Sequence, residues 1–203
     1  MSKTLVTTIA SCLILAVGGA CSSTPPLAEQ AKNSPDVQAA DTEIERFSDG
    51  DAQYVGFYNN FLYRATILNS NVRSALLRKQ NEFYQWDRDK FSGEREKSDR
   101  NAGTETTIFL SFFTPERRND NLSDAKSIWR VYLDAGDRRY QGKVKKLRTP
   151  LAELVALYPY HTRWNTAYEV TFPIPTPAIE TQALKLTITG PLGVKTVSFA
   201  AAR

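Results

Sequence analysis

The sequence predicts a mainly β protein: an antiparallel, immunoglobulin-like β-sandwich with one amphipathic helix, formed by residues 51–203. Three observations predict this fold class. Segments rich in aromatic and β-branched residues recur from residue 61 to residue 200, and short turn sequences separate them. Only one segment carries the spacing of apolar residues that is typical of a helix. Many short strands with one helix favour two packed sheets, and a small open barrel is the alternative.

The first strand is expected at 61–68, and the helix follows it. Residues Asn69–Asn71 offer N-caps, and apolar residues then recur every seven positions in two adjacent rows. These rows are Leu76 with Phe83, and Leu77 with Tyr84 and Phe91. The pattern predicts a helix of about 20 residues that ends before Gly93. The charged segment 94–103 is expected to be a mobile connection.

The remaining strands are expected in the second half of the chain. They are 106–114, 127–133, 139–147, 164–172, 182–189 and 194–200. Trp129, Val131 and Leu133 alternate along one strand and therefore share one face, which predicts that they are buried. The polar strand 139–147 is expected at a sheet edge, and 190–193 form the last hairpin turn.

Residues 1–20 are typical of a secretory signal peptide. Residues 4–28 carry no charge, and their apolar part leads into Gly18-Gly19-Ala20-Cys21. This apolar part is shorter than the roughly 20 residues that a membrane-spanning helix needs. The cysteine after small residues resembles the lipobox of bacterial lipoprotein precursors. The resemblance implies that the Cys21 thiol carries a diacylglyceryl group, that the chain is cleaved before Cys21, and that the lipid binds a membrane.

A second cysteine is the alternative to Cys21. Ile9-Ala10-Ser11-Cys12 fits the lipobox better by residue type, but it leaves only residues 4–11 as an apolar region. Ser22, rather than Asp, follows Cys21, and in lipoprotein sorting this resembles an outer-membrane destination. We therefore predict lipidation at Cys21 and a location in the bacterial cell envelope, at the outer membrane.

Residues 21–50 are predicted to be the lipidated cysteine and a disordered tether. They are rich in Ser, Pro, Ala, Gln and Asp, and large apolar residues are few. Residues 22–50 hold six acidic and two basic residues, a net charge of −4, whereas residues 51–203 hold 16 acidic and 23 basic residues, a net charge of +7. This asymmetry favours a soluble tether that does not adhere to anionic membranes.

The folded part also resembles a group of uncharacterised bacterial envelope lipoproteins. The resemblance lies in a short set of landmarks in the second half of the chain. These are Thr114-Pro115, Ser127-Ile128-Trp129, Tyr158-Pro159-Tyr160 with Trp164 and Tyr168, and Gly190-Pro191-Leu192-Gly193. It implies a secreted β-rich module and brings no activity with it.

Catalytic and metal chemistry have few candidate residues. A mean hydropathy of −0.40 excludes a polytopic membrane protein. His161 is the only histidine, and no Gly-x-Ser-x-Gly elbow accompanies it, so stacking or capping is its expected role. Asp87 and Asp89 are interpreted as solvated charges. The loop 119–121 with Asp124 is a calcium candidate, but such Asn-Asp runs are more often turns. We predict no catalytic residue, metal or cofactor.

Aromatic and basic residues provide two further candidate surfaces. An aromatic set favours either sugar stacking or a core, and we favour the core for Trp129 and Trp164. The set comprises Trp129, Tyr132, Tyr158, Tyr160, Trp164 and Tyr168. A basic stretch without acidic residues predicts a polyanion-binding edge, and the alternative is protection of an edge strand against aggregation. This stretch holds Arg138, Arg139, Lys143, Lys145, Lys146 and Arg148.

These features predict a lipid-anchored cell-envelope protein that acts as a binding or assembly module. Its expected partners are the membrane, anionic envelope components or another envelope protein, and export disfavours nucleic acid. The alternative is a carboxylate-dependent envelope hydrolase that acts on sugar or peptidoglycan. A purely structural envelope lipoprotein is a third interpretation.

Overall fold

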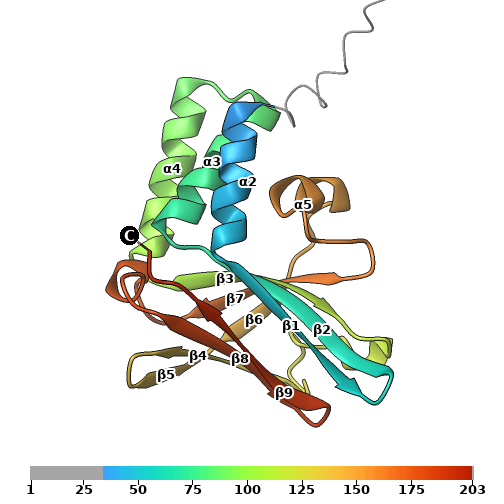
Figure 1. Cartoon of the computed structure of the whole chain (residues 1–203). Helices are drawn as coiled ribbons and strands as arrows, with labels where there is room; N and C mark the ends of the chain where they lie inside the picture. The colour runs from blue at the N-terminus through green and yellow to red at the C-terminus, as the bar shows by residue number, and fades with distance from the viewer. Residues whose placement is uncertain (1–33, 203) are drawn as a thin grey trace, which may run out of the picture.

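The computed structural model describes residues 34–202. The predictions for the signal peptide 1–20 and for lipidation of Cys21 lie outside these residues. The described chain forms two antiparallel sheets that face each other, with α-helices packed beside the larger sheet (Figure 1). The predicted mainly β, immunoglobulin-like sandwich with one helix is therefore wrong: the fold is mixed α/β, with four α-helices among the described residues.

The two sheets contain nine strands among the described residues, and all neighbouring strands are antiparallel. The larger sheet has the order β1 (Ser48–Val55), β2 (Tyr58–Ile67), β3 (Thr106–Phe113), β7 (Thr166–Phe172) and β6 (Lys143–Lys146). The smaller sheet has the order β5 (Arg138–Gln141), β4 (Arg130–Ala135), β8 (Leu184–Gly190) and β9 (Gly193–Phe199). Two single-turn 3₁₀ helices, Arg117–Asn119 and Thr176–Ala178, lie in the connections.

The main apolar core lies between the sheets. Trp129 is 2% exposed, and its ring meets the rings of Phe61 and Phe112 edge-on, with centroids 4.9 and 5.3 Å away. Its indole N–H donates a hydrogen bond to the carbonyl of Asn119 over 2.7 Å. Val131 and Leu133 are buried on the same face of β4. The prediction from their alternation is confirmed.

The sheets are joined at one edge and meet at the other. The predicted single strand 139–147 is wrong, because β5 and β6 lie in different sheets and Gly142 stands between them. A Cβ at Gly142 would lie 2.5 Å from Val170 Cγ1, so only glycine allows the chain to cross here. At the opposite edge Lys195 of β9 lies 3.1 Å from Asp51 of β1.

Helix α2 (Pro35–Arg46) overturns part of the predicted tether. Ser34 caps it by accepting a hydrogen bond from the Val37 N–H, and proline stands in its first turn. Val37, Ala40 and Ile44 are buried, at the spacing of one helical face. The prediction of disorder over 34–50 is wrong because three apolar residues at this spacing suffice to pack the helix, although most of its surface is polar.

Two helices replace the single helix that was predicted. Helix α3 (Ser70–Tyr84) ends at Gln85, whose φ of 49° is left-handed. Helix α4 (Arg88–Ala102) then runs through Gly93 and the segment predicted to be a mobile connection. Asp87 caps α4 by accepting from the Lys90 N–H over 2.7 Å, and Lys90 pairs with Glu94 one turn later. Caps and ion pairs support this helix, in which only Ala102 is buried.

The fourth helix, α5 (Leu151–Leu157), was not predicted. It buries Leu154 and Leu157 and leads into the bend at Tyr158. No helix in the region 34–202 is both long enough and apolar enough to span a membrane.

Replacing Trp129 with alanine is expected to destabilise the fold by about 3–5 kcal/mol, because it empties the centre of the core. Trp129→Phe should cost less, since it keeps an aromatic ring and loses the hydrogen bond to Asn119. The exposed Trp164 is the matched control, and Trp164→Ala should leave the stability nearly unchanged. Urea unfolding of the three variants measures these free energies. A Trp129→Ala variant as stable as Trp164→Ala contradicts the prediction.

Candidate functional site

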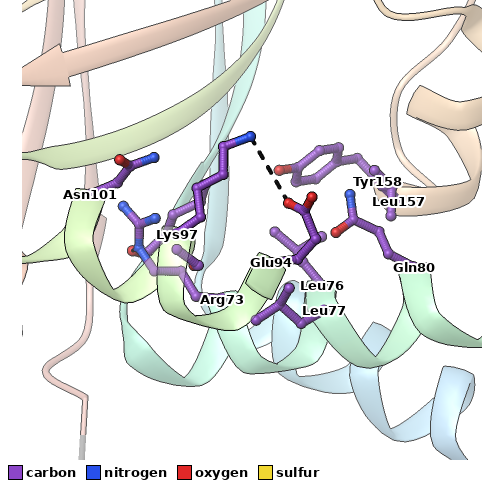
Figure 2. A pocket seen from close by; sticks show the side chains of 11 residues that line it. Arg73, Leu76, Leu77, Gln80, Glu94, Lys97, Asn101, Leu157 and Tyr158 are labelled. Atoms are coloured by element: carbon purple, nitrogen blue, oxygen red, sulfur yellow. Dashed lines mark hydrogen bonds and ion pairs between the residues drawn. The ribbon is translucent and has the colours of Figure 1, made fainter. Parts of the chain in front are cut away.

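The candidate site is a cleft between the helices and the larger sheet (Figure 2). Its first hollow has a volume of about 240 Å³ and lies between α3, α4 and the bend after α5. A second hollow of about 230 Å³ lies between α5 and the sheet. The two hollows are adjacent and share four lining residues, and we refer to them together as the cleft. The shared residues are Leu68, Gln80, Leu157 and Tyr158.

Both faces of the larger sheet are covered, and this creates the floor of the cleft. In β3, every residue from Thr106 to Phe112 is buried. Thr107 and Phe109 alternate with the residues that face the smaller sheet, and they line the second hollow. The ring of Tyr158 stacks on Phe109 with centroids 3.6 Å apart and an angle of 3°. This stack fixes the bend after α5 against the sheet.

Helix α3 carries the main cation of the first hollow. Arg73 donates from Nε to the carbonyl of Leu68 over 2.8 Å and from Nη2 to Thr107 Oγ1 over 3.3 Å. Across residues 34–202, no carboxylate forms an ion pair with Arg73. Burial lowers the pKa of its guanidinium group. Glu105, Asp99 and Glu169 oppose this effect from beyond ion-pair distance. A half-buried arginine that no carboxylate contacts directly can bind an anionic group of a ligand.

Helix α4 adds a weaker ion pair to the same hollow. Lys97 Nζ lies 4.0 Å from Glu94 Oε2 (Figure 2), and this lysine is 66% exposed at its side chain. In Figure 2 the Tyr158 hydroxyl points toward the space between these side chains. Burial raises the pKa of the Tyr158 phenol, so this group stays protonated at neutral pH and can donate a hydrogen bond.

The second hollow is acidic. Glu153 of α5 and Glu169 of β7 line it, and no basic residue is among its lining residues. Glu153 also accepts a hydrogen bond from the Tyr84 hydroxyl; burial, followed by this bond, raises the pKa of that phenol. The cleft therefore has an acidic side at Glu153 and Glu169. Its other side holds Arg73 and Lys97 with the paired carboxylate of Glu94, and we call it the basic side.

A buried ion pair holds the helices around the cleft. Lys79 of α3 is 1% exposed, and its ammonium group pairs with Asp41 of α2. It also donates to the carbonyl of Leu157 at the end of α5, over 3.4 Å. Burial lowers the pKa of this lysine, and the contacts with Asp41 oppose that effect. Three helices therefore depend on one charged side chain.

His161 has a structural role in the aromatic bend that follows α5. Its Nδ1 lies 2.8 Å from Ser111 Oγ, and its ring meets Phe109 edge-on at 5.8 Å. Ser111 and His161 are both buried, at 0% and 3% exposure, so a substrate cannot reach this serine–histidine pair. Stacking in the aromatic bend, the expected role, is what the structure shows.

The predicted polyanion-binding residues are divided between two sheets. Arg138 and Arg139 lie on the edge strand β5, whereas Lys143, Lys145 and Lys146 lie on the edge strand β6. Arg148 follows β6 in the connection to α5. Arg139 is held by Asp134 in a two-pronged ion pair with distances of 2.6 and 2.8 Å. The other five cations are exposed and remain a predicted polyanion surface.

Two further predictions concern Trp164 and the calcium candidate around Asp120. Trp164 is 63% exposed, so its predicted place in the core is wrong: the loop that carries it turns outward before β7 begins. In the calcium candidate, the carboxylate of Asp120 accepts hydrogen bonds from the hydroxyls of Thr166 and, over 2.9 Å, Tyr168. This carboxylate therefore connects a loop to β7.

The cleft residues themselves were missed by sequence reasoning. Arg73 belongs to the polar positions of the predicted helix, and Glu94 and Lys97 belong to the segment predicted to be a mobile connection. Glu153 and Glu169 are isolated charges in the sequence. The signal that comes nearest is the aromatic bend at Tyr158, which is a landmark of the resemblance to envelope lipoproteins. The chain matches no protein-family model, no curated protein and no solved structure, so its function has to be inferred from this site.

Stability is expected to fall as the pH drops below about 6.5, because burial lowers the pKa of His161 in the folded state. The unfolded chain takes up a proton near its ordinary pKa, about 6.5, before the folded chain does, so protonation favours unfolding. His161→Gln removes this titration and keeps a polar partner for Ser111. Melting temperatures between pH 7.5 and pH 5 should therefore fall more steeply in the wild type. Parallel curves contradict the prediction.

Proposed function

We propose that this protein is a lipid-anchored binding module of the bacterial outer membrane, and that its cleft binds a small zwitterionic ligand of the amino-acid or short-peptide type. The observation that carries the proposal is the separation of charge in the cleft. The first hollow holds the cations Arg73 and Lys97 with one carboxylate, Glu94, that is already paired with lysines. The adjacent hollow holds acidic groups and no basic one, and leucine side chains line both hollows. Apolar walls with a few convergent polar groups are typical of small-molecule sites.

The basic side suits a carboxylate. A guanidinium group presents N–H donors in a fixed fork that matches two carboxylate oxygens. Arg73 is already oriented by Leu68 and Thr107, so little side-chain freedom is lost when it binds an anion. The protonated Tyr158 hydroxyl points into the same hollow and can donate a further hydrogen bond (Figure 2).

The acidic side suits an ammonium group. Glu169 lies on β7 between β3 and β6, so its backbone is held in a central strand. Glu153 faces the same hollow from α5. A ligand with both charges can reach both sides, whereas a purely anionic ligand would meet the two glutamates. The charge pattern therefore favours a zwitterion over a polyanion at this site.

The envelope location rests on the sequence. The uncharged segment 4–28 and Gly18-Gly19-Ala20-Cys21 support export and lipidation. Both cysteines of the chain, Cys12 and Cys21, precede the described fold, which can therefore form no internal disulfide in an oxidising compartment. The resemblance to envelope lipoproteins supports the same location.

The hydrolase alternative has one observation in its favour. Glu153 and Glu169 line the same hollow, and paired carboxylates are what glycoside hydrolysis requires. This alternative predicts the release of reducing ends from purified peptidoglycan, lost in Glu169→Gln. The binding proposal predicts no release with either protein.

Calorimetric titration with the dipeptide alanyl-alanine tests the binding proposal. Arg73→Gln should weaken binding by about tenfold or more, because a hydrogen bond to a charged group contributes roughly 1.5–3 kcal/mol. The matched control is Arg78→Gln, an exposed arginine on the same helix that does not line the cleft.

Modified dipeptides distinguish the two sides of the cleft. An N-acetyl derivative should lose the contact with the glutamates, and a C-terminal amide should lose the contact with Arg73. Equal affinity for all three compounds, or equal effects of Arg73→Gln and Arg78→Gln, would show that the cleft does not recognise a zwitterion.

Lipidation is tested by labelled-lipid incorporation in the producing cells. Cys21→Ala should abolish incorporation and release most of the protein from the membrane fraction, because several acyl chains together provide stable anchoring and this variant carries none. Cys12→Ala is the matched control and should remain lipidated. Incorporation that persists in Cys21→Ala and is lost in Cys12→Ala would assign the lipid to Cys12.

A further inference from the structure

A cluster of exposed apolar side chains lies at one end of the fold, far from the cleft. The hairpin between β1 and β2 carries four of them, and its turn is Gly56 with a φ of 60°. The exposed fractions are 54% for Tyr54, 64% for Val55, 108% for Phe57 and 55% for Tyr58. A ring as exposed as that of Phe57 makes no packing contact with the fold, so folding does not explain this residue.

A second hairpin joins the same end. Asn60 Nδ2 donates to the carbonyl of Leu192 in the turn between β8 and β9, over 3.1 Å. A Cβ at Gly193 would lie 2.8 Å from Gln53 Cγ, so the two hairpins are in close contact. Val194, which follows this turn, is 58% exposed. We name the five exposed residues the apolar tip: Tyr54, Val55, Phe57, Tyr58 and Val194.

Both hairpins are uncharged in and around their turns. No Asp, Glu, Lys or Arg occurs from residue 52 to residue 63, or from residue 186 to residue 194. The first charged neighbours, Asp51 and Lys195, form an ion pair with each other behind the tip. The neighbouring loop does carry charge, because Glu116, which pairs with Arg118, lines the same small hollow as Tyr58 and Leu192. The apolar tip is therefore an uncharged patch beside a charged loop.

We propose that the apolar tip inserts into the interfacial region of a lipid bilayer. The turns of the β1–β2 and β8–β9 hairpins lie at the end of the fold away from the helices (Figure 1). A bilayer accepts a protruding apolar group without a matching pocket, and the two hairpin turns that form the tip carry no charged side chain of their own. Tyrosine residues on either side of a phenylalanine are typical of the membrane–water interface, where their hydroxyls stay hydrated.

The tip provides a contact separate from the N-terminus. In Figure 1, α2 begins at the top of the molecule and the β1–β2 hairpin ends at the lower right, so the two points lie at opposite ends of the fold. Two groups that each bind a membrane weakly can together anchor a protein stably. A lipid on Cys21 and the apolar tip would therefore hold the domain at two points, and the tip contact does not depend on what the cleft binds.

Tryptophan quenching in reconstituted vesicles tests the proposal on the full-length protein as it is isolated from membranes. Phe57→Trp places a reporter on the tip, and Asp137→Trp places one in the exposed turn between β4 and β5, which lies away from the tip in Figure 1. The wild type supplies the background of its three tryptophans. Each protein is reconstituted into phosphatidylcholine vesicles, with and without bromine atoms on the lipid chains.

The added emission of Phe57→Trp should be shifted to the blue and lose at least half of its intensity in brominated vesicles. The added emission of Asp137→Trp should be unchanged. Both effects should persist at 0.5 M salt, about three times the physiological concentration, because the tip carries no charge. Equal quenching of the two reporters overturns the proposal. A blue shift of Phe57→Trp in detergent-free solution without vesicles also overturns it, because a second copy would then cover the tip.

A second variant keeps the test independent of the reporter. Tyr54→Ser with Tyr58→Ser removes the flanking rings without touching the core, since both residues are more than half exposed. Combined with Phe57→Trp, this change should reduce the quenching by brominated lipid at least twofold. Unchanged quenching would show that the tyrosines do not hold the tip in the bilayer.

Discussion

The constraint on which the structure depends is the burial of β3 on both faces. Every residue from Thr106 to Phe112 is buried, so the larger sheet needs a cover on each side. The smaller sheet covers one face through Trp129, and the helices with the aromatic bend cover the other. Because a β-sheet packs on one face of the larger sheet and helices pack on the other, the fold is mixed α/β. An immunoglobulin-like sandwich leaves the outer faces of its sheets to solvent, and β3 excludes that arrangement.

The layer of helices and aromatic bend that covers the larger sheet contains buried polar groups as well as apolar ones. The hydrogen bonds of these polar groups order the side chains around the cleft. Ser111 is satisfied by His161, and Thr107 accepts a hydrogen bond from Arg73. Thr66 bonds with the hydroxyls of Ser48 and Tyr160. Buried polar groups of this kind need partners, so the covering layer is held in register. The cleft lies where α3, α4 and α5 do not close completely over the sheet, and ordered side chains surround it.

The two ends of the molecule have different chemistry because different elements form them. The helical end carries paired charges, among them Lys79 with Asp41 and Lys90 with Glu94. At the hairpin end the two turns carry no charged side chain and expose aromatic rings. A ligand with two opposite charges suits the cleft, whereas an apolar phase suits the tip. The proposed membrane contact and the proposed ligand site thus occupy separate surfaces.

The sequence by itself determined the features that depend on neighbours in the chain. Alternation predicted the buried face of Trp129, Val131 and Leu133, and glycines predicted the turn at 190–193. Tertiary structure alone decided the rest. Helix α2 forms from a polar segment because its three apolar residues meet the fold, and Gly142 moves the chain between sheets because Val170 and Phe172 leave no room for a side chain. The cleft unites residues from five elements, α3, α4, β3, α5 and β7, and local periodicity holds no information on which distant side chains will face one another.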